Sequence, residues 1–212
     1  MLAGQHPLKV LFIGNSHTYV NDLPAMVKGL LESDGKHRSV TTRLVAVEFL
    51  NNAALKVDFH PGEWDVVVLQ GASLSSSHKF KYSNDGALSL AKAACKSGAK
   101  TLLFAEWPRD GWDESDWICS SYKEIFGSTK AKLVDVPHVF DQVHAKFPDV
   151  GLWQPDGNHE QTPGTFIAAA CIHRWIVGAG GPAPSYVAPG VPKALAAFAE
   201  DAAKARFLKV AR

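Results

Sequence analysis

Five short apolar runs recur along the chain, and stretches with helical periodicity separate most of them. Continuous apolar runs, rather than alternating ones, are typical of strands that are buried on both faces of a parallel sheet. The runs predict strands over residues 8–13, 43–47, 65–70, 101–105 and 132–136. The pattern does not determine the order of these strands in the sheet.

Helical patterns lie between and after these runs. They predict helices over residues 24–32, 87–95, 115–126, 139–146, 162–175 and 193–210. This alternation favours a three-layer α/β/α sandwich with a five-stranded, mainly parallel sheet and right-handed crossovers. Thr162 is expected to cap its helix, with Pro163 as the first helical residue. The last helix is expected to be amphipathic and to pack on the sheet, so that residues 1–212 form a single domain.

Composition limits the possible partners. The chain has 212 residues, a formal net charge of +1 and no block of like charges, so it lacks the electrostatic signature of a protein that binds nucleic acid or an anionic membrane. A small or neutral partner is expected, and the oligomeric state stays open. The three cysteines, Cys95, Cys119 and Cys171, show no CxxC spacing, which argues against a disulfide framework and a zinc site. Cys95 and Cys171 are interpreted as buried thiols, and no metal or cofactor is expected.

The first seven residues are too short and too polar for a signal peptide, and no apolar run approaches the roughly 20 residues needed to cross a bilayer. We therefore expect a soluble, cytoplasmic protein. A leader removed from a longer precursor is the alternative.

The first candidate for chemistry is Ser16, in the sequence GNSHT at residues 14–18. It follows the first predicted strand, and ligands bind at the carboxyl ends of the strands in an open parallel sheet. Free backbone N–H groups at a helix start would stabilise the oxyanion formed when a serine attacks a carbonyl. The alternative is that Ser16 only caps a helix, as serines before helices commonly do.

A serine hydroxyl needs a base to remove its proton, and His159 near the other end of the chain is the candidate. Asp156 precedes it by three positions in a predicted loop, where its carboxylate could hold one ring nitrogen and leave the other facing the serine. The alternative is that Asp156 and His159 only shape a surface loop.

These segments resemble two blocks of the SGNH (GDSL-like) hydrolases: GNSHT resembles the first block and the DGNH of residues 156–159 the family's DxxH block. The resemblance is closest to an uncharacterised branch whose third block reads LQ, as Leu69 and Gln70 do here. It implies a flavodoxin-like sandwich, with Ser16 as the nucleophile, His159 as the base and Asp156 as its orienting acid.

The resemblance also suggests an oxyanion hole. The backbone N–H of Ser16 would be one donor, and the side-chain amide of Gln70 would replace the family's third-block asparagine. The family's second-block glycine has no clear match, and Asn52 lies roughly where it should be. Asparagine tolerates left-handed backbone conformations better than most residues, so a backbone donor there could survive the replacement.

Tryptophans are grouped with acidic residues between positions 106 and 117, after the fourth predicted strand. Trp107 and Trp112 are candidates for binding a sugar ring. The alternative is that they cover the core from a loop.

Three functions remain open. The first is a serine esterase that removes short acyl groups, such as acetyl from a carbohydrate or a similar polar substrate, through an acyl-enzyme. The second is a lipase or thioesterase with the same three residues, and the third is a non-catalytic module that binds phosphate or a nucleotide at the first turn. Neither a GxxxxGK[ST] nor a GxGxxG sequence is present, and the chain lacks both the GxSxG nucleophile motif and HExxH.

Overall fold

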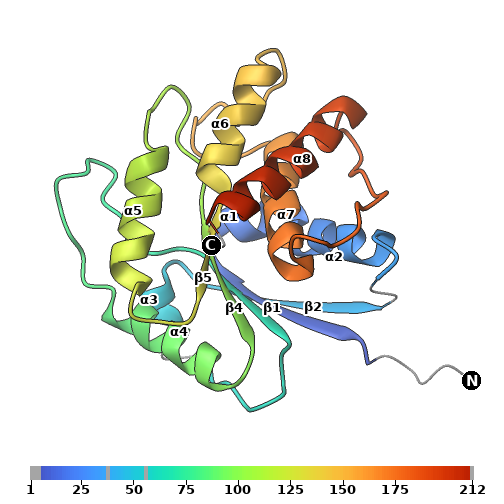
Figure 1. The fold of residues 1–212 in the computed structure, drawn as a ribbon. Coiled ribbons are helices and arrows are strands. Elements are labelled where there is room, and N and C mark those ends of the chain that lie inside the picture. Colours follow the sequence, from blue (N-terminus) through green and yellow to red (C-terminus); the bar gives the residue numbers. More distant parts are fainter. Residues whose placement is uncertain (1–5, 37–38, 55–56, 211–212) are drawn as a thin grey trace, which may run out of the picture.

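The computed structural model describes residues 6–36, 39–54 and 57–210, and its strands form one parallel sheet (Figure 1). The strands are β1 (Leu8–Gly14), β2 (Val40–Ala46), β3 (Val66–Leu69), β4 (Lys100–Ala105) and β5 (Lys132–Asp135). Their order in the sheet is β2-β1-β3-β4-β5, and every neighbouring pair is parallel. The predicted five-stranded sheet is therefore confirmed. Because all the carboxyl ends lie at one edge, the loops that follow the strands meet there.

Both faces of the sheet are covered. In β1, Val10 and Phe12 belong to one buried cluster, while Leu11 and Ile13 belong to the other. Side chains alternate between the faces of a strand, so a strand buried on both sides must be apolar at every position. The burial of both faces therefore explains why the apolar runs in the sequence are continuous.

Helices form the two outer layers (Figure 1). One face carries α2 (Leu23–Ser33), α6 (Val136–Lys146), α7 (Thr162–Val177) and α8 (Lys193–Val210). The other carries α3 (Leu50–Ala53), α4 (Asp85–Lys96) and α5 (Ser115–Phe126). The α/β/α sandwich is thus as predicted.

Several details differ from the sequence prediction. The pattern did not predict the short elements α1 (Ser16–Tyr19), η1 (Val20–Asp22) and α3. β5 ends at Asp135 because that residue caps α6, accepting a hydrogen bond from the N–H of His138. The α7 helix has Gln161, not Thr162, in the cap position, so Pro163 is its second residue.

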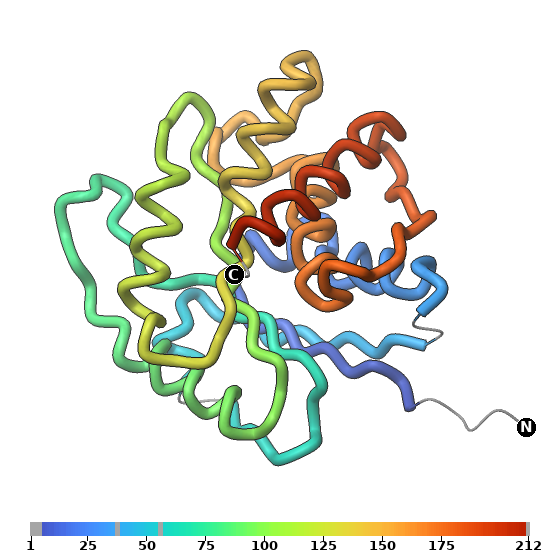
Figure 2. Tube along the Cα trace, in the orientation of Figure 1, coloured from blue at the N-terminus to red at the C-terminus, as the bar shows by residue number. Residues whose placement is uncertain are grey.

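The C-terminal helix α8 packs mainly against α7 and α6 rather than on the sheet (Figure 2). Its buried face is mostly alanine, with Leu195, Ala196, Ala199, Ala202 and Ala203. Small side chains permit close packing of α8 against these two helices. Cys171 is buried as expected, whereas Cys95, which was also expected to be buried, is partly exposed; Cys119 is buried as well. None of the helices in the described ranges is both long and apolar enough to span a membrane.

Candidate active site

The turn after β1 presents Ser16. Asn15 is the cap of α1, and its side-chain oxygen accepts a hydrogen bond of 3.1 Å from the N–H of His17. The cap position is therefore occupied by Asn15, and Ser16 is the first helical residue. This removes the local reason for reading Ser16 as a cap and leaves its hydroxyl available to a distant partner.

Close packing under this turn explains its glycine. A Cβ atom at Gly14 would lie 2.2 Å from Thr18 Oγ1 and 2.8 Å from Gln70 Oε1. Both of those oxygens belong to one buried hydrogen-bond system. A larger residue would displace it, together with the turn that carries Ser16.

The loop between α6 and α7 presents His159. Asp156 Oδ1 accepts hydrogen bonds of 2.9 Å from the backbone N–H groups of both Asn158 and His159. Gly157, which lies between Asp156 and Asn158, has a φ of +66°, a backbone conformation that glycine adopts without a steric penalty. This tight turn folds His159 back over the carboxylate.

The structure brings Ser16, His159 and Asp156 together although the serine and the histidine are 143 positions apart in the sequence. Asp156 Oδ2 lies 2.6 Å from His159 Nδ1, and Ser16 Oγ lies 2.8 Å from His159 Nε2. A carboxylate can only accept, so Nδ1 carries the ring proton and Nε2 accepts from the serine hydroxyl. The hydrogen bond from His159, with those from the two backbone N–H groups, lowers the pKa of Asp156 to about 2. The orienting carboxylate is therefore ionised at neutral pH.

Three contacts from the β4–α5 connection hold the His159 loop. Trp107 Nε1 donates to the Asn158 carbonyl at 2.9 Å, and Trp153 Nε1 donates to the Pro108 carbonyl at 2.8 Å. The N–H of Asp110 donates to the Gly157 carbonyl at 2.8 Å. Main-chain contacts of this kind restrict where the imidazole can lie.

A second histidine, His17, lies beside His159, with 5.3 Å between the ring centroids. Burial, together with the neighbouring His159, lowers the pKa of His17 to about 4, although Asp156 opposes the shift. His17 is stacked on Trp107, and its Nε2 lies 3.2 Å from the Asn158 side-chain amide. At neutral pH it is therefore uncharged and does not oppose the formation of an imidazolium on His159.

Ser16 lines an open cavity of about 530 Å³ together with Asn15, Tyr19, Ala46, Val47, Glu48, Phe49 and Asn52. Asn52 thus shares the Ser16 cavity, as its assignment requires. Its backbone is helical rather than left-handed, and its N–H already donates to the Phe49 carbonyl at 2.9 Å. Any hydrogen bond from Asn52 to a ligand would have to come from its side-chain amide.

Gln70 is almost fully buried and does not line this cavity. Its Oε1 accepts from the N–H of Asn15 at 3.0 Å and from the hydroxyl of Thr18 at 2.9 Å. Its Nε2 donates to Glu106 at 3.3 Å, and the Tyr122 hydroxyl donates to the same carboxylate oxygen at 2.8 Å. The amide predicted to face an oxyanion instead holds both sides of the Ser16 turn.

We expect Gln70→Leu to lower the free energy of unfolding by about 2–4 kcal/mol, because it leaves the partly buried Asn15 N–H and the buried Thr18 hydroxyl unpaired. Urea denaturation followed by tryptophan fluorescence measures this. Gln142→Leu, on the exposed face of α6, is the matched control and should change stability by less than about 0.5 kcal/mol. Equal stability of the two variants would contradict the supporting role of Gln70.

The two tryptophans predicted to bind substrate occupy different environments. Trp107 is only 2 % exposed and, with His17 and Asn158, lines a small cavity of about 150 Å³. Trp112 is 55 % exposed, and the Arg109 guanidinium lies 4.1 Å from the centre of its ring. Neither lines the Ser16 cavity, so the alternative reading of Trp107 as support for a loop fits its contacts better.

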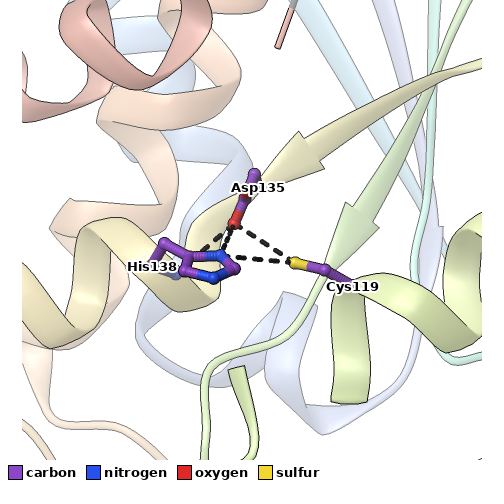
Figure 3. A group of neighbouring side chains, drawn as sticks. All are labelled: Cys119, Asp135 and His138. Carbon is purple, nitrogen blue, oxygen red and sulfur yellow. Dashed lines mark hydrogen bonds and ion pairs between the residues drawn. The ribbon is translucent and has the colours of Figure 1, made fainter. Parts of the chain in front are cut away.

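Cys119, Asp135 and His138 offer ligand atoms within 4.8 Å of one another and could geometrically hold a metal ion (Figure 3). Cys119 lies 16 positions before Asp135, so no short spacing motif joins the three residues in the sequence. Arg206 Nε lies 2.5 Å from Asp135 Oδ2, so a guanidinium already pairs with this carboxylate. Burial and the nearby Asp135 raise the pKa of the Cys119 thiol far above its usual range, which disfavours the thiolate that a metal needs. Asp135 of this cluster therefore forms an ion pair with Arg206, which joins β5 to α8.

A further cavity of about 410 Å³ lies beside α4 and α5, with Leu74, Tyr82, Leu88 and Trp117 among its lining residues. It shares no lining residue with the Ser16 cavity.

Comparisons with known proteins bear on the fold. No protein-family model matches the chain, and no curated protein is significantly similar in sequence. Among solved structures, the chain is similar to a candidate SGNH hydrolase from Slackia heliotrinireducens, with 21 % identity and a TM-score of 0.56, over 81 % of this chain and 100 % of that one. A DUF4886 family protein from Bacteroides uniformis matches over 96 % of this chain and 95 % of its own, with 16 % identity and a TM-score of 0.61.

A family 3 carbohydrate esterase from Clostridium thermocellum is similar over 82 % of this chain and 100 % of its own, with 14 % identity and a TM-score of 0.51. At these identities the similarity concerns the fold. The chain has an SGNH-like α/β/α fold. The sequence blocks and the fold thus agree on the same architecture.

Proposed function

We propose that this protein is a serine hydrolase that cleaves short acyl esters, with Ser16 as the nucleophile, His159 as the base and Asp156 as the group that orients the base. The observation that carries the proposal is the continuous hydrogen-bond chain from Ser16 through His159 to Asp156, with links of 2.8 and 2.6 Å. We further propose that residues 1–212 form one domain. The single five-stranded sheet with a buried core on each face supports this proposal.

In the proposed reaction, Ser16 Oγ attacks the ester carbonyl while its proton passes to His159 Nε2. The tetrahedral intermediate collapses when the alcohol leaves with that proton, and an acyl-serine remains. Water then attacks the acyl group with His159 again as the base, which releases the acid and restores the serine. Asp156 stays ionised and stabilises the imidazolium that forms in each half of the cycle.

The developing oxyanion needs hydrogen-bond donors. We assign the Ser16 backbone N–H and the Asn52 side-chain amide, since both residues line the cavity at the nucleophile. Gln70 is not assigned as a donor, because its amide nitrogen already donates to Glu106 and its oxygen already accepts hydrogen bonds from the Ser16 turn. The second donor therefore differs from the one that the sequence resemblance suggested.

The cavity lining supports a small, polar substrate. Asn15, Glu48 and Asn52 alternate with Tyr19, Val47 and Phe49, so the surface around Ser16 is mixed rather than uniformly apolar. A long acyl chain would have to lie against polar groups there. The preferred substrate is accordingly an acetyl or similarly short ester of a carbohydrate or another polar alcohol.

We expect kcat/KM for p-nitrophenyl esters to fall at least about tenfold from acetyl to octanoyl, which requires only ~1.4 kcal/mol of differential binding. A stopped-time absorbance assay over esters from acetyl to palmitoyl measures this. Faster turnover of the long esters would favour a lipase or thioesterase. No turnover, together with no labelling of Ser16 by a fluorophosphonate, would contradict a hydrolase and favour a binding role.

A further inference from the structure

Three polar side chains join the segment that follows Ser16 to the segment that follows His159. Asn21 Nδ2 donates to the Glu160 carbonyl at 3.1 Å and to Thr165 Oγ1 at 2.9 Å. Thr165 Oγ1 in turn donates to Glu160 Oε1 at 3.0 Å. Asn21 lies five positions after Ser16, and Glu160 directly follows His159. The contacts therefore bridge the two halves of the candidate active site behind its reacting atoms.

The backbone at Asn21 is shaped for this contact. Asn21 and Asp22 have φ values of +58° and +54°, so two successive residues that are not glycine adopt the left-handed conformation. Asparagine and aspartate tolerate this region better than other side chains, and such conformations persist only where surrounding contacts fix them. Here the reversal of the chain directs the Asn21 amide toward α7 and the His159 loop.

Glu160 is an unusual member of this network because its side chain is fully buried. Thr165 donates to Oε1, whereas Oε2 has no hydrogen-bond partner from another residue in the described ranges. Burial raises the pKa of Glu160 to about 8, its own backbone N–H and the Thr165 hydroxyl oppose the shift, and the charge of Asp156 adds to it. The carboxyl is therefore mostly neutral at pH 7.

The groups around Glu160 explain its preference for the neutral form. Thr165 from α7 donates to its carboxyl and Asn21 from η1 donates to its backbone carbonyl, and both groups are uncharged. Among the titratable groups of its own loop, Asp149, Asp156 and His159, Asp156 acts on it as a negative charge. No cation contacts its carboxyl among the residues that the structure describes. Ionisation would thus place an unpaired charge inside the network.

We propose that the network of Asn21, Thr165 and Glu160 is a positioning device that sets the distance between Ser16 Oγ and His159 Nε2. This inference rests on the proposed hydrolase function. Neither the segment after Ser16 nor the loop of His159 is part of a long regular element, so their relative position depends on contacts between them. Loss of alignment by even an ångström strongly lowers the rate of an oriented reaction.

The first test removes individual links. Thr165→Val keeps the side-chain shape and removes the hydroxyl, and Asn21→Gly removes the amide but retains the left-handed backbone. Each is expected to lower kcat for p-nitrophenyl acetate about tenfold, with KM changed less than about twofold, because alignment rather than binding is lost. Thr165→Ser, which restores the hydroxyl, should recover most of kcat.

Thr101→Val is the matched control. Thr101 is buried like Thr165, but it lies at the amino end of β4, whereas Ser16 follows the carboxyl end of β1. It should leave kcat unchanged. Thermal unfolding monitored by circular dichroism identifies any variant that loses activity by failing to fold, and in that case the pH profile of Glu160→Gln against wild type provides the comparison. Full kcat in folded Thr165→Val and Asn21→Gly would overturn the proposal.

The second test uses the titration of Glu160. In the wild type, kcat should decline as the pH rises through about 8, because the ionised carboxylate disrupts the network. Glu160→Gln is neutral and keeps an oxygen for Thr165, so it should stay within about threefold of wild-type kcat at pH 7 and lack this decline. An unchanged alkaline profile in Glu160→Gln would count against the role of Glu160.

The inference and the function on which it rests fail in different ways. If Ser16→Ala is inactive while the network variants keep full kcat, the function stands and the positioning device does not. If Ser16 can be replaced without loss of activity, the proposed function fails first. The rate at which a fluorophosphonate modifies Ser16 gives an independent readout of alignment, and it should fall in Thr165→Val in parallel with kcat.

Discussion

Ser16→Ala is expected to lower kcat for p-nitrophenyl acetate by at least about 10⁴-fold, which corresponds to ~5.5 kcal/mol of lost transition-state stabilisation. His159→Ala should have a similar effect. The reason is that the hydroxyl and the imidazole act as one unit across their 2.8 Å hydrogen bond. Without the base the hydroxyl is a poor nucleophile, and without the hydroxyl the base has nothing to activate.

The double variant separates this mechanism from two independent effects. If Ser16 and His159 form one unit, replacing both should cost no more than replacing either alone. Ser97→Ala, at the end of α4, and His60→Ala, in the exposed loop before β3, are matched controls that should retain full activity. Strictly additive losses in the double variant, or residual activity above about 10 % in Ser16→Ala, would contradict the assignment.

The sheet could be predicted from the sequence because strands that are buried on both faces consist of continuous apolar runs. Val10 to Ile13 are apolar at every position, and each is used by one core or the other. The proximity of Ser16, Asp156 and His159 also followed from the sequence, since the two motifs resemble blocks of one family and the carboxyl ends of the strands share an edge. These predictions rest on strong local patterns.

The surroundings of the site were harder to predict because they depend on contacts across long sequence separations. Gln70 was expected to face the substrate, yet its two ends bind Asn15 and Glu106, which lie 55 and 36 positions away. A strand-end glutamine looks the same in either role. The register of β3 against β1 turns it under the Ser16 turn rather than toward the cavity.

The buried network behind the site left no recognisable sequence signal. Glu160 and Thr165 flank the start of α7, where polar residues are common. Only the fold shows that both are fully buried and that Asn21, in an unpredicted turn, reaches them. Asn158 was within the recognised block, but its contacts with His17 and Trp107 depend on the position of the β4–α5 connection.

The second large effect is expected at Asp156, where asparagine should be more damaging than alanine. Asp156→Asn keeps an oxygen that can accept from the N–H groups of Asn158 and His159, so the turn is preserved. Its amide, however, can donate to His159 Nδ1, which favours the tautomer with the proton on Nε2. That nitrogen can then no longer accept the proton of Ser16, and kcat should fall about 10³-fold or more.

Asp156→Ala removes both the turn contacts and the carboxylate but imposes no tautomer. The Asp156 side chain is 48 % exposed, so water can approach Nδ1 in its place, and the loss should be nearer about 10²-fold. Single-turnover kinetics with p-nitrophenyl acetate compare the acylation rates of the two variants directly. If alanine proved the more damaging substitution, Asp156 would matter chiefly for the shape of the His159 turn. In the expected order, Asp156→Asn disturbs the turn less than Asp156→Ala and still gives the slower enzyme. The reason is that the asparagine amide places the imidazole proton on His159 Nε2.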